Sequence, residues 1–506
     1  MRTRKLIAGA AMAVAAGAIA VACGGGDTLQ VSRGTVIENA TIVDTRDGSL
    51  ITGQSIVIAD GTIQQVTPRG IQATGSAVVV DATGKFVVPG FLDMHTHAMS
   101  RVDSTPPDWP LLIANGVTGI REMSGSAAVI ARARQLNADA AAGRVDAPEV
   151  LVIPSDIFAG QSPTAAGAAA FVDQKKADGA DFIKMVAGTR DAVLGLMAEA
   201  KVQGLDVAGH LSPTVSALDS SNAGMHAMEH LGAGWGLLLD CAADQANIRA
   251  QALPLQASLL PTPAFAVINP RVFDATLNAP FYQRILDTYS DAQCQSLAAA
   301  FVQNGTWQVP TLIRLRTQNF GADPAYTADP NLKYVAPTTR ALWTQLGQQF
   351  AALPASAVAT LQRYYTREKQ VTLLMKRAGV PMLAGSDLSG VWLVPGFSLH
   401  QEFRELAAAG LTPLEVLQMT TLNGAQFLHR ESSMGTVSAG RGANLVLLDA
   451  NPLADVANLD AISSVVLRGK VFTSADLSKL KSDAAAAVAT QPTRALRTAL
   501  DPTDVD

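Results

Sequence analysis

Strand-length apolar runs that alternate with helical stretches constrain the fold of this chain more than any other feature. Eight such runs lie between residues 85 and 430, and alanine-rich helical patterns such as 127–142 and 189–203 follow most of them. This alternation is typical of parallel strands joined by helical crossovers, and eight repeats predict an α/β fold with a (β/α)8 (TIM) barrel over residues 85–430. In chain order the runs are KFVVPGFLDMH, GVTGIRE, EVLVIPS, DFIKMVA, GLDVAGH, MHAMEHL, WQVPTLI and VPMLAGSD.

Short β-branched runs broken by glycine and aspartate occur near both ends of the chain, in residues 32–84 and 431–475. Such runs are typical of hairpins in an antiparallel sheet. The two segments therefore predict one small β-sandwich domain, built from both chain ends around the inserted barrel. The interval 230–307 is too long for one strand-to-helix connection and predicts extra helices that cover the barrel mouth. Residues 476–506 predict a helical tail that frays at its end.

The N-terminal residues predict an export signal. A basic start is followed by an apolar run of small residues that ends at Cys23, a pattern typical of a bacterial lipoprotein signal peptide. We expect residues 1–22 to be removed, lipid to be attached to Cys23, and residues 23–31 to form a tether. This predicts an exported lipoprotein of the bacterial cell envelope, periplasmic or attached to the outer membrane. The alternative is a transmembrane anchor, but about 16 apolar residues, mostly alanine, make a short span.

Charge and cysteine content narrow the possible partners. Loss of residues 1–22 removes three basic residues and no acidic one, so the net charge changes from −5 to −8. A chain this acidic argues against nucleic acid as a partner. Contact with a membrane is expected only through the lipid on Cys23. The other two cysteines, Cys241 and Cys294, would enter an oxidising compartment, and the sequence leaves open whether they form a disulfide.

Polar residues interrupt the apolar runs where the predicted strands end, and active sites of (β/α)8 barrels lie at that end. His95 and His97 stand two residues apart, so both can face the same side of a strand. Each residue alone is more often structural than functional, but five of the six are common metal ligands, which predicts a metal site. The six residues are His95, His97, Lys184, His210, His230 and Asp387. His226, His400 and His429 lie off this pattern.

Lys184 is difficult to explain as an ordinary lysine. It lies in the apolar run DFIKMVA, where an inward ammonium among metal ligands would lose its water and be repelled by the cations. A lysine that has reacted with CO2 carries an anionic carbamate with two oxygens. Lys184 in that form could bridge two cations.

Seven segments of the chain together resemble the amidohydrolase superfamily, in particular its imidazolonepropionase-like and Xaa-Pro dipeptidase (prolidase-like) branch. They are VVPGFLDMHTH, FIKM, AGH, MEHL, AGSD, SLHQEF and GTVSAGRGANLVLLDANPL, and the resemblance runs from about residue 34 to 475. It implies that His95, His97 and Asp387 hold one divalent ion, that His210 and His230 hold another, and that carboxylated Lys184 and a hydroxide bridge the two. Zinc is the first metal expected. The chain departs from the pattern at Asn444 and Glu122, where aspartate is more common.

The expected chemistry is hydrolysis of an amide bond. Two metal ions lower the pKa of a bridging water and polarise a carbonyl, and Asp387 would move a proton to the leaving nitrogen. Expected substrates are small amides: dipeptides, Xaa-Pro peptides or N-acyl amino acids. Arg314 could clamp a substrate carboxylate, although we favour a surface position for it.

Two other functions compete with amide hydrolysis. A deaminase or cyclic-amide hydrolase with one metal ion needs the histidines and Asp387, but Lys184 argues against it because one metal needs no bridge. A surface lipoprotein that binds without catalysis would tolerate loss of a ligand, and none is lost. The sequence leaves open whether the chain forms a homo-oligomer.

Overall fold

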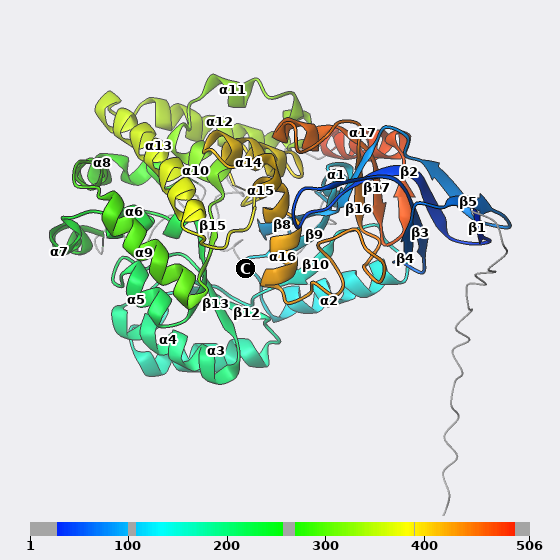
Figure 1. The fold of residues 1–506 in the computed structure, drawn as a ribbon. Coiled ribbons are helices and arrows are strands. Elements are labelled where there is room, and N and C mark those ends of the chain that lie inside the picture. Colours follow the sequence, from blue (N-terminus) through cyan, green and yellow to red (C-terminus); the bar gives the residue numbers. More distant parts are fainter. Residues whose placement is uncertain (1–27, 100–107, 257–268, 389, 491–506) are drawn as a thin grey trace, which may run out of the picture.

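The computed structural model describes residues 28–99, 108–256, 269–388 and 390–490. The predicted signal peptide and Cys23 lie outside these residues, so the export prediction stays a prediction. Within the described ranges, every helix is too short or too polar to span a lipid bilayer. The chain builds a parallel α/β region and, beside it, a mainly antiparallel sheet (Figure 1). The α/β fold predicted from the sequence is confirmed.

Parallel strands form two sheets in the α/β region, with the orders β10-β9-β8 and β11-β12-β13-β14-β15. Single parallel bridges pair Thr96 with Leu388 and Gln308 with Met382, so the segment 382–388 lies between β8 and β15. At the other edge, the Asp181 amide donates a hydrogen bond of 3.0 Å to the carbonyl of Ile153. The strands are β8 (Phe91–Thr96), β9 (Val117–Glu122), β10 (Glu149–Val152), β11 (Phe158–Ala159), β12 (Phe182–Ala187), β13 (Asp206–Gly209), β14 (Met225–Glu229) and β15 (Trp307–Val309).

The run VPMLAGSD does not form the regular strand that its apolar pattern predicts. It pairs with its neighbours only through the bridges at Met382 and Leu388. Pro381 has no backbone N–H to donate to a ladder. At Gly385 the segment comes so close to β8 that an added Cβ would lie 2.8 Å from the Cβ of His95. The prediction of a regular strand was therefore wrong, although the segment does run beside β8.

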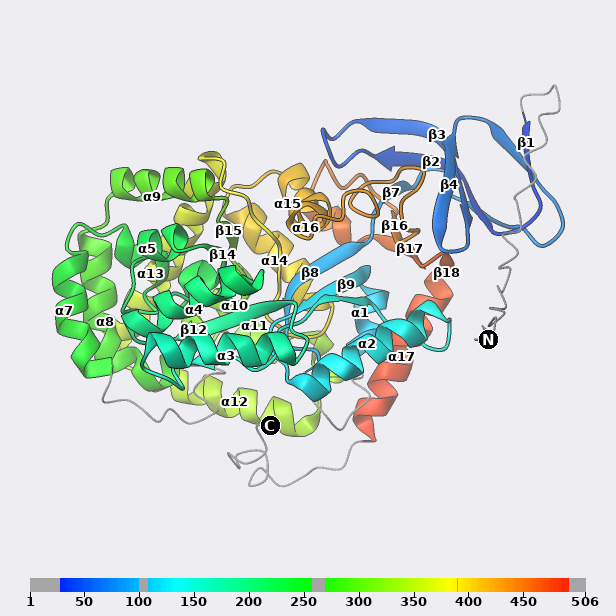
Figure 2. The same ribbon diagram turned by 90° about the horizontal axis from the view of Figure 1, so that it is seen from below.

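Helices follow the parallel strands as the alternation of the sequence predicts. Ser126, Thr164 and Thr189 cap α2, α3 and α4, each accepting a hydrogen bond from a backbone N–H in the first turn. Helices α3 and α4 pack side by side on the outside of the strands (Figure 2). In this part of the chain the helices are α1 (Asp108–Ala114), α2 (Ala127–Ala141), α3 (Ala165–Ala177), α4 (Arg190–Gln203), α5 (Ala217–Asn222) and the 3-10 turn η1 (His230–Gly232).

The long interval between β14 and β15 contains extra helices, as expected from its length. A disulfide joins Cys241, at the end of α6, to Cys294 in α9, which answers the question that the sequence left open. The helices here are α6 (Gly236–Asp240), α7 (Gln245–Gln256), α8 (Arg271–Asp287) and α9 (Asp291–Asn304). Beyond β15 the chain forms α10 (Leu312–Asn319), α11 (Pro324–Thr327), η4 (Pro330–Tyr334), α12 (Pro337–Ala351), α13 (Ala355–Arg377), α14 (Phe397–Ala408), α15 (Pro413–Met419), α16 (Leu422–Phe427), η5 (Val456–Asp460) and α17 (Ser474–Ala489).

Strands from both ends of the chain share one mixed sheet with the order β18-β17-β16-β7-β2-β3-β4, and β6 pairs with β2. Blue N-terminal strands and orange-red C-terminal strands lie beside each other in Figure 1 because β16 runs antiparallel to β7. The strands are β2 (Thr35–Val43), β3 (Leu50–Ala59), β4 (Thr62–Thr67), β6 (Val78–Asp81), β7 (Phe86–Pro89), β16 (Leu445–Leu448), β17 (Ile462–Leu467) and β18 (Lys470–Phe472), and β1 (Thr28–Val31) pairs separately with β5 (Gly70–Ala73). The sandwich architecture and the exact domain boundaries stay predictions.

Candidate metal centre

Three buried side chains from separate segments meet at the carboxyl ends of the parallel strands: His95 from β8, His230 from η1 and Asp387. One potential ligand atom of each lies within 4.8 Å of those of the other two. His95 Nε2 is 3.2 Å from Asp387 Oδ1, and His230 Nε2 is 3.8 Å from Asp387 Oδ2. Imidazole nitrogens and a carboxylate that converge in this way are the donors that zinc prefers.

His97 joins this cluster from the residue after β8. Its Nε2 lies 3.3 Å from Asp387 Oδ1, and the centroids of the His95 and His97 rings are 5.5 Å apart. The other ring nitrogen, Nδ1, is 3.0 Å from Ser124 Oγ. Both histidines therefore turn an Nε2 toward the same carboxylate oxygen, which is the shared orientation that their two-residue spacing predicts.

His210, the residue after β13, and Lys184, on β12, lie beside the cluster. The His210 ring centroid is 5.1 Å from that of His230, which is itself 4.5 Å from that of His95. Lys184 is 1% exposed, and its Nζ has no hydrogen-bond partner among the described residues. Burial lowers the pKa of Lys184 to about 8, although the nearby carboxylates of Glu229 and Asp387 act in the opposite direction.

The charge states of these groups suit a cation site. Burial lowers the pKa values of His97, His210 and His230, and the shifts of His210 and His230 are the larger ones. Burial alone would raise the pKa of Asp387, but His230 and His95 bring it well below its usual range. Neutral imidazoles beside an ionised carboxylate present free lone pairs, as metal coordination requires.

Two residues that sequence reasoning missed hold the His95 ring in place. Glu229 Oε2 lies 2.6 Å from His95 Nδ1, and Glu229 Oε1 lies 2.6 Å from a terminal nitrogen of Arg121. Burial raises the pKa of Glu229, but Arg121 and His95 outweigh it and bring the value to about 2. A carboxylate on one ring nitrogen leaves the other free to bind metal. The signal in the sequence was a charged residue inside each of two apolar runs, MHAMEHL and GVTGIRE.

Backbone strain gathers at the same place. His230, Leu231, Thr311 and Asp387 have positive φ values of 56°, 51°, 44° and 54°. Such conformations cost about 1–3 kcal/mol each for residues other than glycine and are found most often at functional sites. Thr311 also places its Oγ1 2.5 Å from His230 Nδ1, which leaves Nε2 of that ring toward Asp387.

The predicted surface position of Arg314 was wrong. Its side chain, on α10, is buried, and its Nε lies 2.9 Å from Asp387 Oδ2. A guanidinium can be buried here because an ionised carboxylate faces it.

His400 lies apart from the centre, as expected, with its Nε2 2.9 Å from the Asn115 carbonyl and its Nδ1 2.6 Å from Asp460 Oδ1.

Fold and site together define a parallel α/β protein with a buried histidine and carboxylate centre at its strand ends. Residues 362–472 match the amidohydrolase family, and of the six candidate residues this range contains Asp387. A solved bottromycin amidohydrolase shares 21% identity over 92% of this chain and 93% of its own, with a TM-score of 0.69. A Xaa-Pro dipeptidase with bound methionine in its active site shares 17% identity over 87% of this chain and 100% of its own, with a TM-score of 0.58.

Curated relatives match shorter segments. Adenine deaminase of Mesorhizobium japonicum is 34% identical over 86 residues, which span 17% of this chain and 14% of that protein. The family match covers residues 362–472, and the likeness to the two solved structures shows a shared fold over most of the chain. Because the matched segment covers so little of the curated relative, the activity and substrates of this chain are matters of proposal.

Proposed function

We propose that the protein is a metal-dependent hydrolase that cleaves C–N bonds in small amides: dipeptides, Xaa-Pro peptides or N-acyl amino acids. The observation that carries this proposal is Lys184, which is buried without a hydrogen-bond partner in the described structure and whose pKa is lowered to about 8. A lowered pKa increases the fraction of neutral amine, and the neutral amine is the form that reacts with CO2. Addition of CO2 to the neutral amine, with release of one proton, would replace a buried amine by an anionic carbamate whose two oxygens can bind metal ions.

We also infer that the parallel strands close into a (β/α)8 barrel, which would support this proposal. Bridges from Thr96 and Gln308 join the segment 382–388 to β8 and β15, and the Asp181 hydrogen bond joins the ends of β10 and β12. With these links the eight parallel segments follow one another in a ring. The six candidate residues then share the end of the barrel where enzymes of this architecture place their active sites.

The donor set fits two divalent ions, of which zinc is the first expected. In this proposal His95, His97 and Asp387 would hold one ion, His210 and His230 would hold the other, and carboxylated Lys184 would supply oxygens to the site. Two such ions would polarise the substrate carbonyl and lower the pKa of water at neutral pH.

The side chains of this chain would supply the positioning and the proton transfer. Asp387 would accept a proton from the attacking water and pass it to the leaving nitrogen. Arg314, 2.9 Å from Oδ2, fixes the direction of that carboxylate. Glu229 holds the His95 ring through Nδ1, so the face that Nε2 presents stays constant.

Metal analysis tests the binuclear assignment. Protein grown with added zinc and bicarbonate should contain about two equivalents of metal per chain, the number that a bridged pair requires. His210→Asn should lose about one equivalent, measured by mass spectrometry of the digested protein. His226→Asn is the matched control, because His226 pairs with Asp206 at 3.1 Å and takes no part in the cluster. One equivalent or none in the wild type would contradict the two-metal assignment.

One observation favours a second function. The segment shared with adenine deaminase is 34% identical, and a deaminase with one metal ion would also use histidines and Asp387. Release of ammonia from adenine, with one metal equivalent bound, would support that alternative over amide hydrolysis. The buried Lys184 favours the two-metal hydrolase, because a single ion needs no bridging group.

We also propose that residues 1–22 are a signal peptide and that Cys23 carries lipid, which would place the enzyme in the bacterial cell envelope. The basis is the basic start, apolar run and cysteine in the sequence. Cys23→Ser should abolish lipid attachment, so that the protein leaves the membrane fraction or stays unprocessed. Fractionation followed by mass measurement of the N-terminal peptide checks this. A wild-type protein that is cleaved at another residue and is free of lipid would contradict the proposal.

A further inference from the structure

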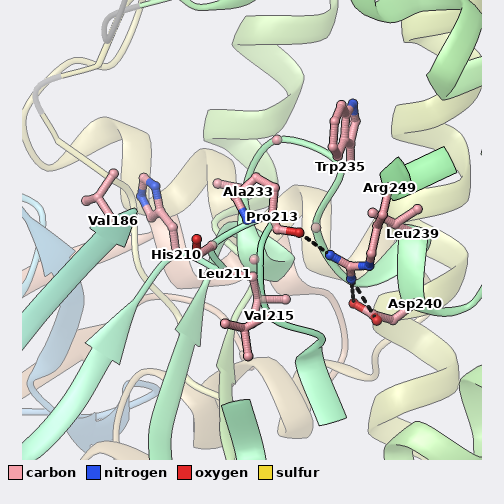
Figure 3. Close-up of a pocket in the computed structure, with 14 residues that line it drawn as sticks. Val186, His210, Leu211, Pro213, Val215, Ala233, Trp235, Leu239, Asp240 and Arg249 are labelled. Atoms are coloured by element: carbon pink, nitrogen blue, oxygen red, sulfur yellow. Dashed lines mark hydrogen bonds and ion pairs between the residues drawn. The ribbon is translucent and has the colours of Figure 1, made fainter. Parts of the chain in front are cut away.

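A cavity of about 160 Å³ lies beside the proposed metal centre and has His210 in its wall (Figure 3). Its other walls come from β12, from the segments that follow β13 and β14, and from helices α6 and α7. The same three consecutive strands carry or precede Lys184, His210 and His230. A substrate held at His210 would therefore have this cavity next to its reacting bond.

Apolar atoms make up slightly more than half of the exposed cavity wall, and the polar part includes His210, Ser212 and the Asp240–Arg249 ion pair. Val186 stands two residues after Lys184 on β12, so it faces the same side of the strand one step nearer the carboxyl end. The segment Gly232-Ala233-Gly234 contributes almost no side-chain volume, which leaves the space open. Its apolar side chains are Val186, Leu211, Pro213, Val215, Trp235 and Leu239. An apolar cavity of about 150 Å³ accepts a molecule the size of benzene, which sets the size of group that fits here.

One ion pair lies across the cavity from His210 in Figure 3, and it is internally neutralised. A terminal nitrogen of Arg249 lies 2.9 Å from each carboxylate oxygen of Asp240, and another donates to the Pro213 carbonyl at 2.5 Å. Asp240 also accepts a hydrogen bond of 3.1 Å from the Ala217 amide. A charged substrate group would lose its water here and find no net opposite charge.

We propose that this cavity is the specificity pocket of the enzyme and that it takes an uncharged, apolar substrate side chain no larger than an isobutyl or phenyl group. The proposal rests on the amide-hydrolase function proposed above. The pocket would select substrates by the polarity and the size of one side chain.

Filling the pocket tests the size requirement. Two dipeptide panels, Xaa-Gly and Gly-Xaa, with Xaa as Gly, Ala, Leu, Asp or Lys, cover both sides of the scissile bond. The pocket faces one side of the scissile bond, so the preference is expected in one of the two panels. There the wild type should prefer Leu over Asp and Lys by at least about tenfold in kcat/KM, the usual scale of discrimination by an apolar pocket. In Val186→Phe, kcat/KM for the Leu substrate should fall at least about tenfold, while kcat/KM for the Ala substrate should stay within a few-fold of the wild-type value.

The control is Val202→Phe, the same substitution at a valine on α4 that is 76% exposed. It should leave the preference unchanged. An unchanged Leu preference in Val186→Phe, or a wild type that prefers Asp or Lys in both panels, would overturn the proposal.

Removing the negative charge tests the electrostatic part. Asp240→Asn keeps the shape and an oxygen for the Ala217 amide but leaves the Arg249 charge without compensation. The ratio of kcat/KM for Asp over Leu substrates should then rise at least about tenfold, since a partly buried positive charge without a partner attracts an anionic group. A ratio equal to that of the wild type would show that the charge pair does not face the substrate, which overturns the pocket assignment.

Direct binding separates this proposal from the proposed function. If the wild type cleaves no member of either panel, amide hydrolysis of dipeptides fails, and N-acetyl-leucinamide and N-acetyl-aspartate are titrated calorimetrically into the metal-loaded protein instead. Tighter binding of the leucine compound that is lost in Val186→Phe supports the pocket on its own. Equal binding by both proteins, or absent binding of the leucine compound, overturns it.

Discussion

Lys184→Ala is expected to abolish amide hydrolysis and to lower the metal content of the purified protein. The Lys184 Nζ is buried and has no hydrogen-bond partner among the described residues, so a carbamate at this position would be the group that holds both ions together. Even residues that only orient a metal ligand change metal affinity or activity about 10–100-fold, so loss of the bridge itself should cost more. Acetate or propionate should restore part of the activity and part of the metal content, because each supplies two carboxylate oxygens in the space that alanine leaves.

Two variants show whether the effect belongs to the carbamate. Lys184→Arg keeps a positive charge but cannot form the carbamate, so it should be as inactive as the alanine variant. Full activity in Lys184→Arg would mean that the site needs a charge and not a bridge. Lys175→Ala removes another buried lysine, one on helix α3 that pairs with Asp156 and Asp178. It should lower stability but keep metal and activity.

It was predictable that the candidate residues would gather at one end of the strands, because strand ends in parallel α/β folds meet at one edge. His95 and His97 required only the two-residue period of a strand. Helix positions followed from alternation and capping: the pattern 189–203 became α4, with Thr189 as its N-cap. These features are local, so sequence alone carries them.

Features that depend on pairing between distant segments were not predictable. Glu229 lies 134 positions from His95, and no local pattern indicates that its carboxylate meets that ring. Arg314 was expected at the surface because a charged residue costs free energy when buried, and only Asp387 opposite it removes that cost. Cys241 and Cys294 stayed undecided because a disulfide requires a separation that only the packing of α6 and α9 supplies.

Local backbone detail also escaped prediction. The run VPMLAGSD has the apolar content of a strand, yet the close approach of Gly385 to His95 limits it to isolated bridges. The positive φ of 54° at Asp387 belongs to the same irregular segment. Strain of this kind persists because surrounding contacts fix it, and those contacts come from β8 and α10, far away in the sequence.

Asp387→Asn is expected to separate catalysis from metal binding. Asparagine has the size of aspartate and keeps an oxygen that can contact a metal ion, but it cannot accept a proton at physiological pH. The fold and most of the bound metal should therefore survive, while kcat for amides should fall by at least about 10² to 10⁴, the usual contribution of a general acid or base. Loss of the charge also leaves Arg314 facing a neutral group, so the melting temperature should be recorded beside the metal content.

The substrate itself provides the control for this variant. An amide nitrogen must be protonated to leave, whereas the leaving group of an activated ester departs without a proton. If Asp387 moves the proton, the ratio of ester to amide turnover should rise in Asp387→Asn, because only the amide reaction loses a step that it needs. An equal loss for both substrates with full metal occupancy would mean that Asp387 acts before proton transfer, as an orienting ligand. Near-normal amide turnover with both ions bound would mean that another residue moves the proton, and the neighbouring histidines would then be the groups to substitute.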